Sequence, residues 1–400
     1  MRGVRLKDVA RLSAGGTPRI DNPGFWTEDE EGVPWVTIGD MSSTRIVNTT
    51  SRRVSEAGIA SLGLTPAPAG TILYSMYASV GLVARLGTSA IWNQAILGIT
   101  PRLGVSARYL AYALDALRPT LGKYLRSNTQ NNLNADVVGN LALNVPDEDE
   151  QRSIAEFLDA ETARVDALVG LRTRQERLLT ERLTTTENFE LNLGQEMDWA
   201  SRPLSRLCDP TRPIQYGIVL PGPDVDDGVL LVKGGDVKPE RLVPTLLSRT
   251  SRDIESGYAR SRLQKRDLVF AIRGGVGEVE LVPESLIGAN ITQDVARIAP
   301  LPDVDELWLL HALRSTHVQS QAASMVTGAT IKGINIGDLR RLAIRVPPPD
   351  MQRGIGHELG ARSAAYARLS QAIHRQIALL RERRQALITA AVSGGVDVGG

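Results

Sequence analysis

Apolar residues along this chain follow two different spacings. Short apolar runs broken by Gly and Pro are typical of β-strands, and helical spacing appears between them in two places. The predicted strands lie at 34–38, 71–76, 230–233 and 267–272, and the predicted short helices at 107–117 and 305–315. Each half of the chain is therefore predicted to begin with a mixed α+β domain.

Two later segments carry apolar residues at alternating spacings of three and four, the pattern of a coiled-coil seam. The two seams consist of Ile154, Leu158, Val165, Leu168 and Leu179, and of Ile355, Leu359, Tyr366, Leu369, Ile373 and Leu380. Polar residues interrupt both seams, which fixes register at some cost in stability; they are Glu161, Arg172, Gln175, Arg362 and Gln376. Because a lone helix cannot bury such a stripe, we predict that the two long helices pair with each other. An acidic, flexible link is predicted at 184–198.

The same order of elements occurs twice, and the sequence itself repeats. Matching segments appear in one order at offsets that drift from 196 to 201 residues, as small gaps in surface loops allow. The pairs are 34–41 with 230–237, 70–81 with 266–277, Gln94 with Gln293, Asn134 with Asn335, 144–158 with 345–359, and 174–182 with 375–383. Ordered matches of this kind indicate a duplication.

Length and charge narrow the class of protein. The chain has 400 residues, more than one core usually serves, so at least two domains are expected. Its formal net charge is +1, so any site for a polyanion must be local. Cys208 is the only cysteine, and no apolar stretch has the length of a signal peptide core or a membrane helix. These features predict a cytoplasmic protein that does not span a membrane.

A series of motifs, none specific alone, carries a resemblance to a known family. In order they are SAGGTP (13–18), PWVTIGD (34–40), GTILYSMYASVG (70–81) with RDLVFAIRGGVG (266–277), WNQAILGITP (92–101), QNNLN (130–134), TIKGIN (330–335), and the VPxxxxQ helix starts at 145–151 and 346–352. In this order they resemble the specificity subunits of Type I restriction-modification systems. The resemblance spans nearly the whole chain.

The resemblance implies an architecture and a set of partners. It implies two α+β target-recognition domains, 1–150 and 198–350, each followed by a spacer helix, 151–197 and 351–400, with the helices packed antiparallel. The expected partners are double-stranded DNA, two methyltransferase subunits and, where the system has one, a restriction subunit. S-adenosylmethionine, ATP and Mg²⁺ would be bound by those partners, and no cofactor or metal by this chain. The chain itself would be non-catalytic.

Helix length adds a physical argument. A helix of about 37 residues from Gln151 rises about 55 Å, longer than the roughly 34 to 36 Å of one DNA turn. Two domains so separated can contact two half-sites and skip the base pairs between them. Different sequences in the two domains then predict an asymmetric bipartite target whose gap is set by the helices.

Two turns at matching positions are candidates for DNA contact. Arg273 precedes Gly274 and Gly275, and an exposed Arg beside glycines can approach a groove and make a bidentate contact with guanine or hold a phosphate. The alternative is a solvated turn or a structural ion pair. The first half has Tyr77 and Ser79 at the corresponding positions, so equivalent chemistry is not expected. Tyr77 either donates to a phosphate or packs.

A polar segment in each half is a further candidate. The residues are Thr129, Gln130, Asn131, Asn132 and Asn134 in the first half, and Lys332 and Asn335 in the second. Their amide and ammonium groups suit adenine edges and phosphates, and the alternative is ordinary turn chemistry.

Other polar positions have plainer interpretations. Gln94 and Gln293 are predicted to be buried and to brace loops, and Gly15, Gly16 and Thr17 to form either a phosphate nest or, more plainly, a turn. The Arg residues of the last helix either lie over DNA or form a solvated or partner-facing surface.

Catalytic motifs are scarce in the sequence. It contains no GxxxxGK[ST] loop, no Cys/His metal spacing and no amino-methyltransferase motif, and its four histidines all lie in the second half. Two alternatives stay open at this level: an interaction scaffold with helical arms that does not bind DNA, and an enzyme whose acid/base pair is hidden among ordinary carboxylates. Salt-sensitive binding to duplex DNA separates the favoured function from both.

Overall fold

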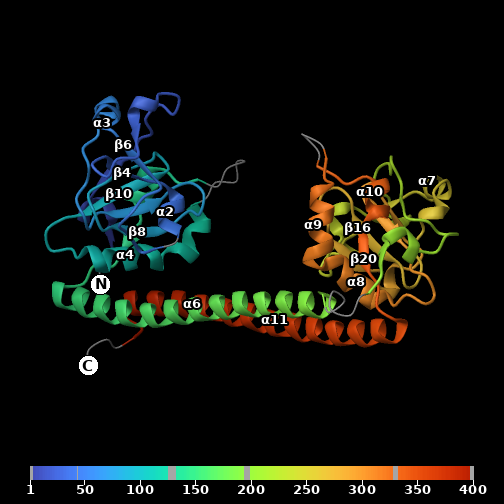
Figure 1. Cartoon of the computed structure of the whole chain (residues 1–400). Helices are drawn as coiled ribbons and strands as arrows, with labels where there is room; N and C mark the ends of the chain where they lie inside the picture. The colour runs from blue at the N-terminus through green and yellow to red at the C-terminus, as the bar shows by residue number, and fades with distance from the viewer. Residues whose placement is uncertain (1–2, 43, 125–131, 193–198, 328–331, 397–400) are drawn as a thin grey trace. The chain divides into compact units, whose positions relative to one another are not determined.

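The computed structural model describes residues 3–42, 44–124, 132–192, 199–327 and 332–396. The chain divides into two compact units: unit 1 is 1–173 with 374–400, and unit 2 is 174–373. Each unit holds one α+β domain and a segment of each of two long helices, α6 (Glu148–Asn192) and α11 (Pro349–Val392) (Figure 1). The predicted fold class is confirmed.

The domain of unit 1 is built on two sheets. The first has the order β2 (Ala10–Ala14), β10 (Ile96–Pro101), β7 (Ile72–Ser75), β8 (Val83–Leu86) and β5 (Ile46–Val47). The second has the order β3 (Trp26–Thr27), β6 (Arg52–Val54), β4 (Val33–Val36) and β9 (Ile91–Trp92), and β1 (Val4–Arg5) pairs with β11 (Ala142–Leu143). The short helices are α1 (Leu6–Val9), α2 (Ile38–Ser42), α3 (Glu56–Leu62), α4 (Ala107–Ala116) and α5 (Ala135–Gly139).

The domain of unit 2 repeats this plan with fewer strands. One sheet has the order β13 (Gln215–Tyr216), β19 (Val295–Ile298), β16 (Leu268–Ala271) and β17 (Val279–Leu281). The others are β15 (Ser248–Thr250), β14 (Val229–Val232) and β18 (Asn290–Ile291), and the pair β12 (Ser201–Pro203) and β20 (Ala343–Arg345). The short helices are α7 (Arg252–Ser256), α8 (Glu306–Arg314), α9 (Thr316–Ser324) and α10 (Ile336–Arg341).

Hydrogen bonds at matching positions confirm the duplication. Leu133 N–H donates to Met76 O at 2.9 Å, and Ile334 N–H donates to Ile272 O at 3.1 Å. The one parallel strand pair of each smaller sheet also matches, β4 with β9 and β14 with β18. Backbone geometry is therefore conserved between the halves where side chains differ.

A glutamine at the same place in each half ties the domain to its long helix. Gln151 Oε1 accepts from Ser106 N–H at 2.8 Å, and Gln352 Oε1 accepts from Asp305 N–H at 3.0 Å. Ser106 and Asp305 are the N-caps of α4 and α8. Both glutamines are buried, so each VPxxxxQ motif links the start of a long helix to the start of a domain helix.

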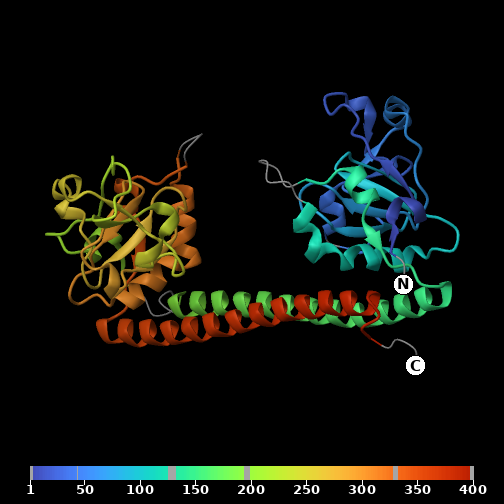
Figure 2. The same ribbon diagram turned by 180° about the vertical axis from the view of Figure 1, so that it is seen from behind.

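Each domain core extends onto the long helices. In unit 1 the core includes Tyr109 of α4, Ile154 and Leu158 of α6, and Ile388 of α11. In unit 2 Trp308 of α8 plays the central part, and side chains from both long helices pack against it. Figures 1 and 2 show from opposite sides that α4 lies between the sheets of unit 1 and α6.

The long helices pair antiparallel within each unit. In unit 2, Ser370 Oγ donates to Glu176 Oε1 at 3.0 Å, and the hydroxyls of Thr180 and Tyr366 are 2.6 Å apart. The later residue of α6 therefore contacts the earlier residue of α11, as an antiparallel pair requires. Two predicted seam residues are exposed: the exposed fraction is 48% for Leu168 and 41% for Leu369. Hydrogen bonds between polar side chains replace apolar packing in this part of the contact.

The predicted link at 184–198 is wrong over its first part, because α6 continues to Asn192. Glu187 accepts a hydrogen bond from Ser363 Oγ at 3.1 Å, and Glu190 pairs with Arg362. The acidic residues that suggested a solvated link make contacts with α11 that local composition does not reveal. Residues 193–198 lie outside the described part. None of the helices described is both long and apolar enough to cross a membrane.

Candidate nucleic-acid interface

The candidate residues of the second half meet where β16 ends in unit 2. The turn 273–277 joins β16 to β17, and Arg273 forms an isolated antiparallel bridge with Gly333. A Cβ on Gly234 would lie 2.0 Å from Arg273 O, so the 234–236 turn lies directly against it. Three segments far apart in sequence thus form one edge of the domain.

Arg273 is an exposed cation at this edge. Its side chain is 47% exposed, and its nearest carboxylate partner is Asp294, at 3.9 Å between Nη1 and Oδ1. An ion pair this long and this exposed contributes little to stability. The Arg273 N–H donates to Asp294 O at 3.1 Å, so the backbone is held while the guanidinium stays accessible.

Lys332 and Asn335 lie beside this turn and are exposed. Asn335 is the N-cap of α10, and its Oδ1 accepts from Asp338 N–H at 2.9 Å while its amide also bonds the Asp338 carboxylate. Its side chain therefore has a structural role, in line with the turn-chemistry alternative. Lys332 carries its charge at the same edge.

The corresponding edge of unit 1 has the same backbone path with different side chains. Tyr77 is 41% exposed at the end of β7, and Ala78 and Ser79 follow it with φ of 27° and 51°. Asn134 is the N-cap of α5, its Oδ1 accepting from Val137 N–H at 2.8 Å. Asn132 is half-buried and has interactions of its own. Thr129, Gln130 and Asn131 lie outside the described residues.

Two further expectations are resolved by the structure. Gln94 is exposed rather than buried, because it follows β9 on a surface turn, where Thr17 Oγ1 donates to it. Gln293 is half-buried. Gly15 and Gly16 pack closely against Trp92. A Cβ on Gly15 would lie 2.3 Å from Trp92 O, and Gly16 N–H already donates to Trp92 O at 2.8 Å. That N–H is not available to a phosphate.

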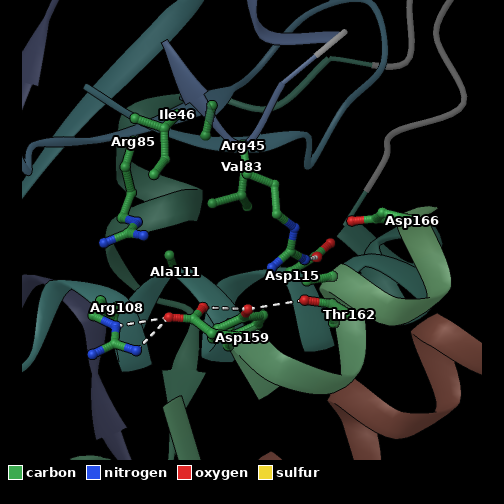
Figure 3. Close-up of a pocket in the computed structure, with 13 residues that line it drawn as sticks. Arg45, Ile46, Val83, Arg85, Arg108, Ala111, Asp115, Asp159, Thr162 and Asp166 are labelled. Carbon is green, nitrogen blue, oxygen red and sulfur yellow. Dashed lines mark hydrogen bonds and ion pairs between the residues drawn. The ribbon is translucent and has the colours of Figure 1, made fainter. Parts of the chain in front are cut away.

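A cavity of about 210 Å³ in unit 1 was not predicted from the sequence. It lies between β5, β8, α4 and α6, and its charged lining residues are Arg45, Arg85, Arg108, Asp115, Asp159 and Asp166 (Figure 3). They are scattered over about 120 positions, and no local motif joins them. The sheet and the two helices bring them together.

Two carboxylates of this cavity are each held by two groups. Asp159 accepts from Arg108 Nε at 2.8 Å and from Tyr112 OH at 2.6 Å; although burial alone would raise its pKa, these hydrogen bonds hold the pKa of Asp159 below its ordinary value. Asp115 pairs with Arg45 at 3.0 Å and with Arg384 of α11 at 3.7 Å.

Within the described parts of the chain, no group of three His, Cys, Asp or Glu side chains is placed to hold a metal ion.

Comparisons with known proteins show what this chain is similar to. Residues 1–173 match the family model of the Type I restriction modification DNA specificity domain. The chain is 24% identical to the Type I restriction enzyme EcoBI specificity subunit of Escherichia coli over 72% of this chain and 65% of that protein. It is 31% identical to the HindI specificity subunit of Haemophilus influenzae over 30% of this chain and 25% of that one.

A solved structure is similar over the whole length. It concerns complex assembly and conformational transition of the Type I restriction-modification system, and one of its chains matches with a TM-score of 0.69 and 18% identity, covering 98% of this chain and 97% of that chain. Residues 1–173 thus match the Type I DNA specificity domain, and the whole chain has the fold of that solved structure. The resemblance inferred from the motifs is confirmed. The chain spans about two thirds of the length of the E. coli relative.

Proposed function

We propose that this chain reads an asymmetric bipartite DNA sequence for a Type I restriction-modification complex. The domains at 1–150 and 198–350 would each read one half. The observation that carries the proposal is the pair of matching turns: the same backbone positions present Tyr77 in unit 1 and Arg273 in unit 2. A guanidinium can contact guanine O6 and N7 together, whereas a phenol cannot, so the two half-sites should differ.

The helices support a fixed gap between the half-sites. Helix α6 has 45 residues and rises about 68 Å at 1.5 Å per residue. One turn of DNA is about 34 to 36 Å, so a helix of this length is suited to hold two reading domains over separated half-sites.

We further propose that the long helices dock two methyltransferase subunits and, where present, a restriction subunit. Large apolar side chains stay exposed on them, which marks a protein contact surface when they cluster; they are Leu168, Leu171, Leu178, Phe189, Leu369 and Leu379. S-adenosylmethionine, ATP and Mg²⁺ would be bound by the partners. This chain would be non-catalytic and would act in the cytoplasm, where the chromosome lies.

The test is modified-base mapping in cells that express the chain with its methyltransferase subunits. Arg273→Ala should cost about 1–3 kcal/mol of discrimination and relax one position in one half-site, leaving the other half intact. Arg260→Ala removes an equal charge from an exposed position in the same unit and serves as control. Uniform weakening at both half-sites would contradict modular reading, and the absence of salt-sensitive binding to duplex DNA would favour the scaffold alternative.

A further inference from the structure

The cavity of unit 1 holds one cation more than its carboxylates neutralise. Four guanidinium groups line or border it, from Arg45, Arg85, Arg108 and Arg384, against three carboxylates. Arg45 and Arg384 share Asp115, and Arg384 also bonds Asp166 at 3.0 Å. Burial, and then the like charge of Arg384, hold the pKa of Arg45 below its ordinary value. With four guanidinium groups against three carboxylates, the cavity and its border carry a net positive charge.

Arg85 is the surplus cation. It extends from β8 into the cavity on the side of Arg108, and none of the interactions drawn in Figure 3 reaches its guanidinium. Among the residues that the structure describes, Arg85 forms no ion pair, since the cavity carboxylates are taken by the other three arginines. Arg108 directs Nε and Nη2 at Asp159, which leaves Nη1 without a partner in the described chain.

The fold does not require an arginine at this position. Strand register places Arg85 opposite Ile72 in unit 1, and Leu281 opposite Leu268 at the corresponding point of unit 2. Leu281 packs against the core of unit 2. The residue matching Arg108 on α8 is Leu307, one position before Trp308 as Arg108 is before Tyr109. The pair of arginines is thus a feature of unit 1 alone.

We propose that the cavity of unit 1 binds a phosphate group between Arg85 and Arg108. Two guanidinium groups from different elements suit a tetrahedral anion with several acceptor oxygens, and Arg is the preferred residue for phosphate. The charge of Asp159 is offset by its ion pair with Arg108, and Tyr112 donates a hydrogen bond to the same carboxylate, which weakens the repulsion of the anion. The favoured source is a DNA phosphodiester, and in that form the inference rests on the proposed function; a free phosphate is the other source.

Salt dependence of DNA binding distinguishes a phosphate contact from a base contact. Each phosphate contact contributes about 0.9 to the slope of log K against log salt for duplex DNA. With the full chain and its methyltransferase subunits, Arg85→Gln should lower this slope by about 0.9 without changing the preferred sequence, and Arg85→Lys should retain it. Arg102→Gln removes an exposed charge elsewhere in unit 1 and should leave the slope as it is.

Binding of inorganic phosphate to the full chain without DNA, followed by ³¹P NMR, is the second arm. A slope lost in Arg85→Gln supports a DNA phosphodiester. An unchanged slope with loss of phosphate binding supports a free phosphate. Unchanged behaviour in both arms overturns the proposal.

Two measurements keep this result separate from other failures. If the unaltered chain shows no salt-sensitive DNA binding, the proposed function fails while the phosphate arm still tests the cavity. Arg85→Leu copies the residue of unit 2 and should fold, as thermal unfolding would show. If Arg85→Gln fails to fold, Arg85→Leu gives the same readout.

Discussion

The turns after β7 and β16 have a similar backbone path, but different residues adopt the positive φ angles that the path requires. In unit 2, Gly274 and Gly275 have φ of 70° and 155°, which glycine adopts without strain. In unit 1, Ala78 and Ser79 have positive φ as well, at a cost on the order of 1–2 kcal/mol per residue. Ser75 offsets part of this, since its Oγ lies 2.5 Å from Tyr77 O and 2.8 Å from Ala78 O.

The hydroxyl brace appears only where glycine is missing. The residue matching Ser75 in unit 2 is Ala271, which has no hydroxyl to donate. The backbone of the turn is kept while its exposed residue changes from Tyr77 to Arg273. The duplication has therefore preserved an exposed turn position and altered its chemistry, as the proposed reading of two different half-sites requires.

The largest expected effect comes from closing the space beside the unit 2 turn. A Cβ on Gly234 would lie 2.0 Å from Arg273 O, so Gly234→Ala must shift backbone and should destabilise the chain by about 2–3 kcal/mol. Gly235→Ala is the matched control, because a Cβ there would have no atom within 4 Å. Urea unfolding measures both. Equal stabilities would mean that the two turns are not in contact.

The features that sequence predicted share one cause. The duplication and the long helices follow from periodicity and from ordered repeats, which report on backbone. The features that the sequence did not predict depend on tertiary contacts. Gln94 proved exposed, residues 184–192 proved helical because Glu187 and Glu190 bond α11, and Arg85 gave no local signal.

Removing the brace of the unit 1 turn should have the next largest effect. Ser75 is buried, and its hydroxyl bonds the carbonyl groups of the turn. Ser75→Ala should therefore cost about 1–2 kcal/mol, since the part-buried hydrogen bond from its hydroxyl is lost and the strained turn loses support. Differential unfolding of the two units, followed by hydrogen exchange at 75–82, should place the loss in unit 1. A variant as stable as the parent would show that the brace does not offset the strain.

The smallest effects are expected from exchanging glycine and alanine at the matching positions of the two turns. Gly274→Ala puts a Cβ at φ of 70° and should cost about 1 kcal/mol, because that Cβ would make only an ordinary contact, 3.8 Å from Gly235 N. Ala78→Gly relieves the same strain in unit 1 but frees the unfolded chain, so its net gain should stay below about 1 kcal/mol. Thermal unfolding of the two single variants and the double variant tests whether the effects add, as they should for sites in separate units. If Gly274→Ala lowers the unfolding temperature and Ala78→Gly raises it, backbone strain distinguishes the two turns. If both variants unfold at a lower temperature, Ala78 is held by packing and backbone strain does not distinguish the turns.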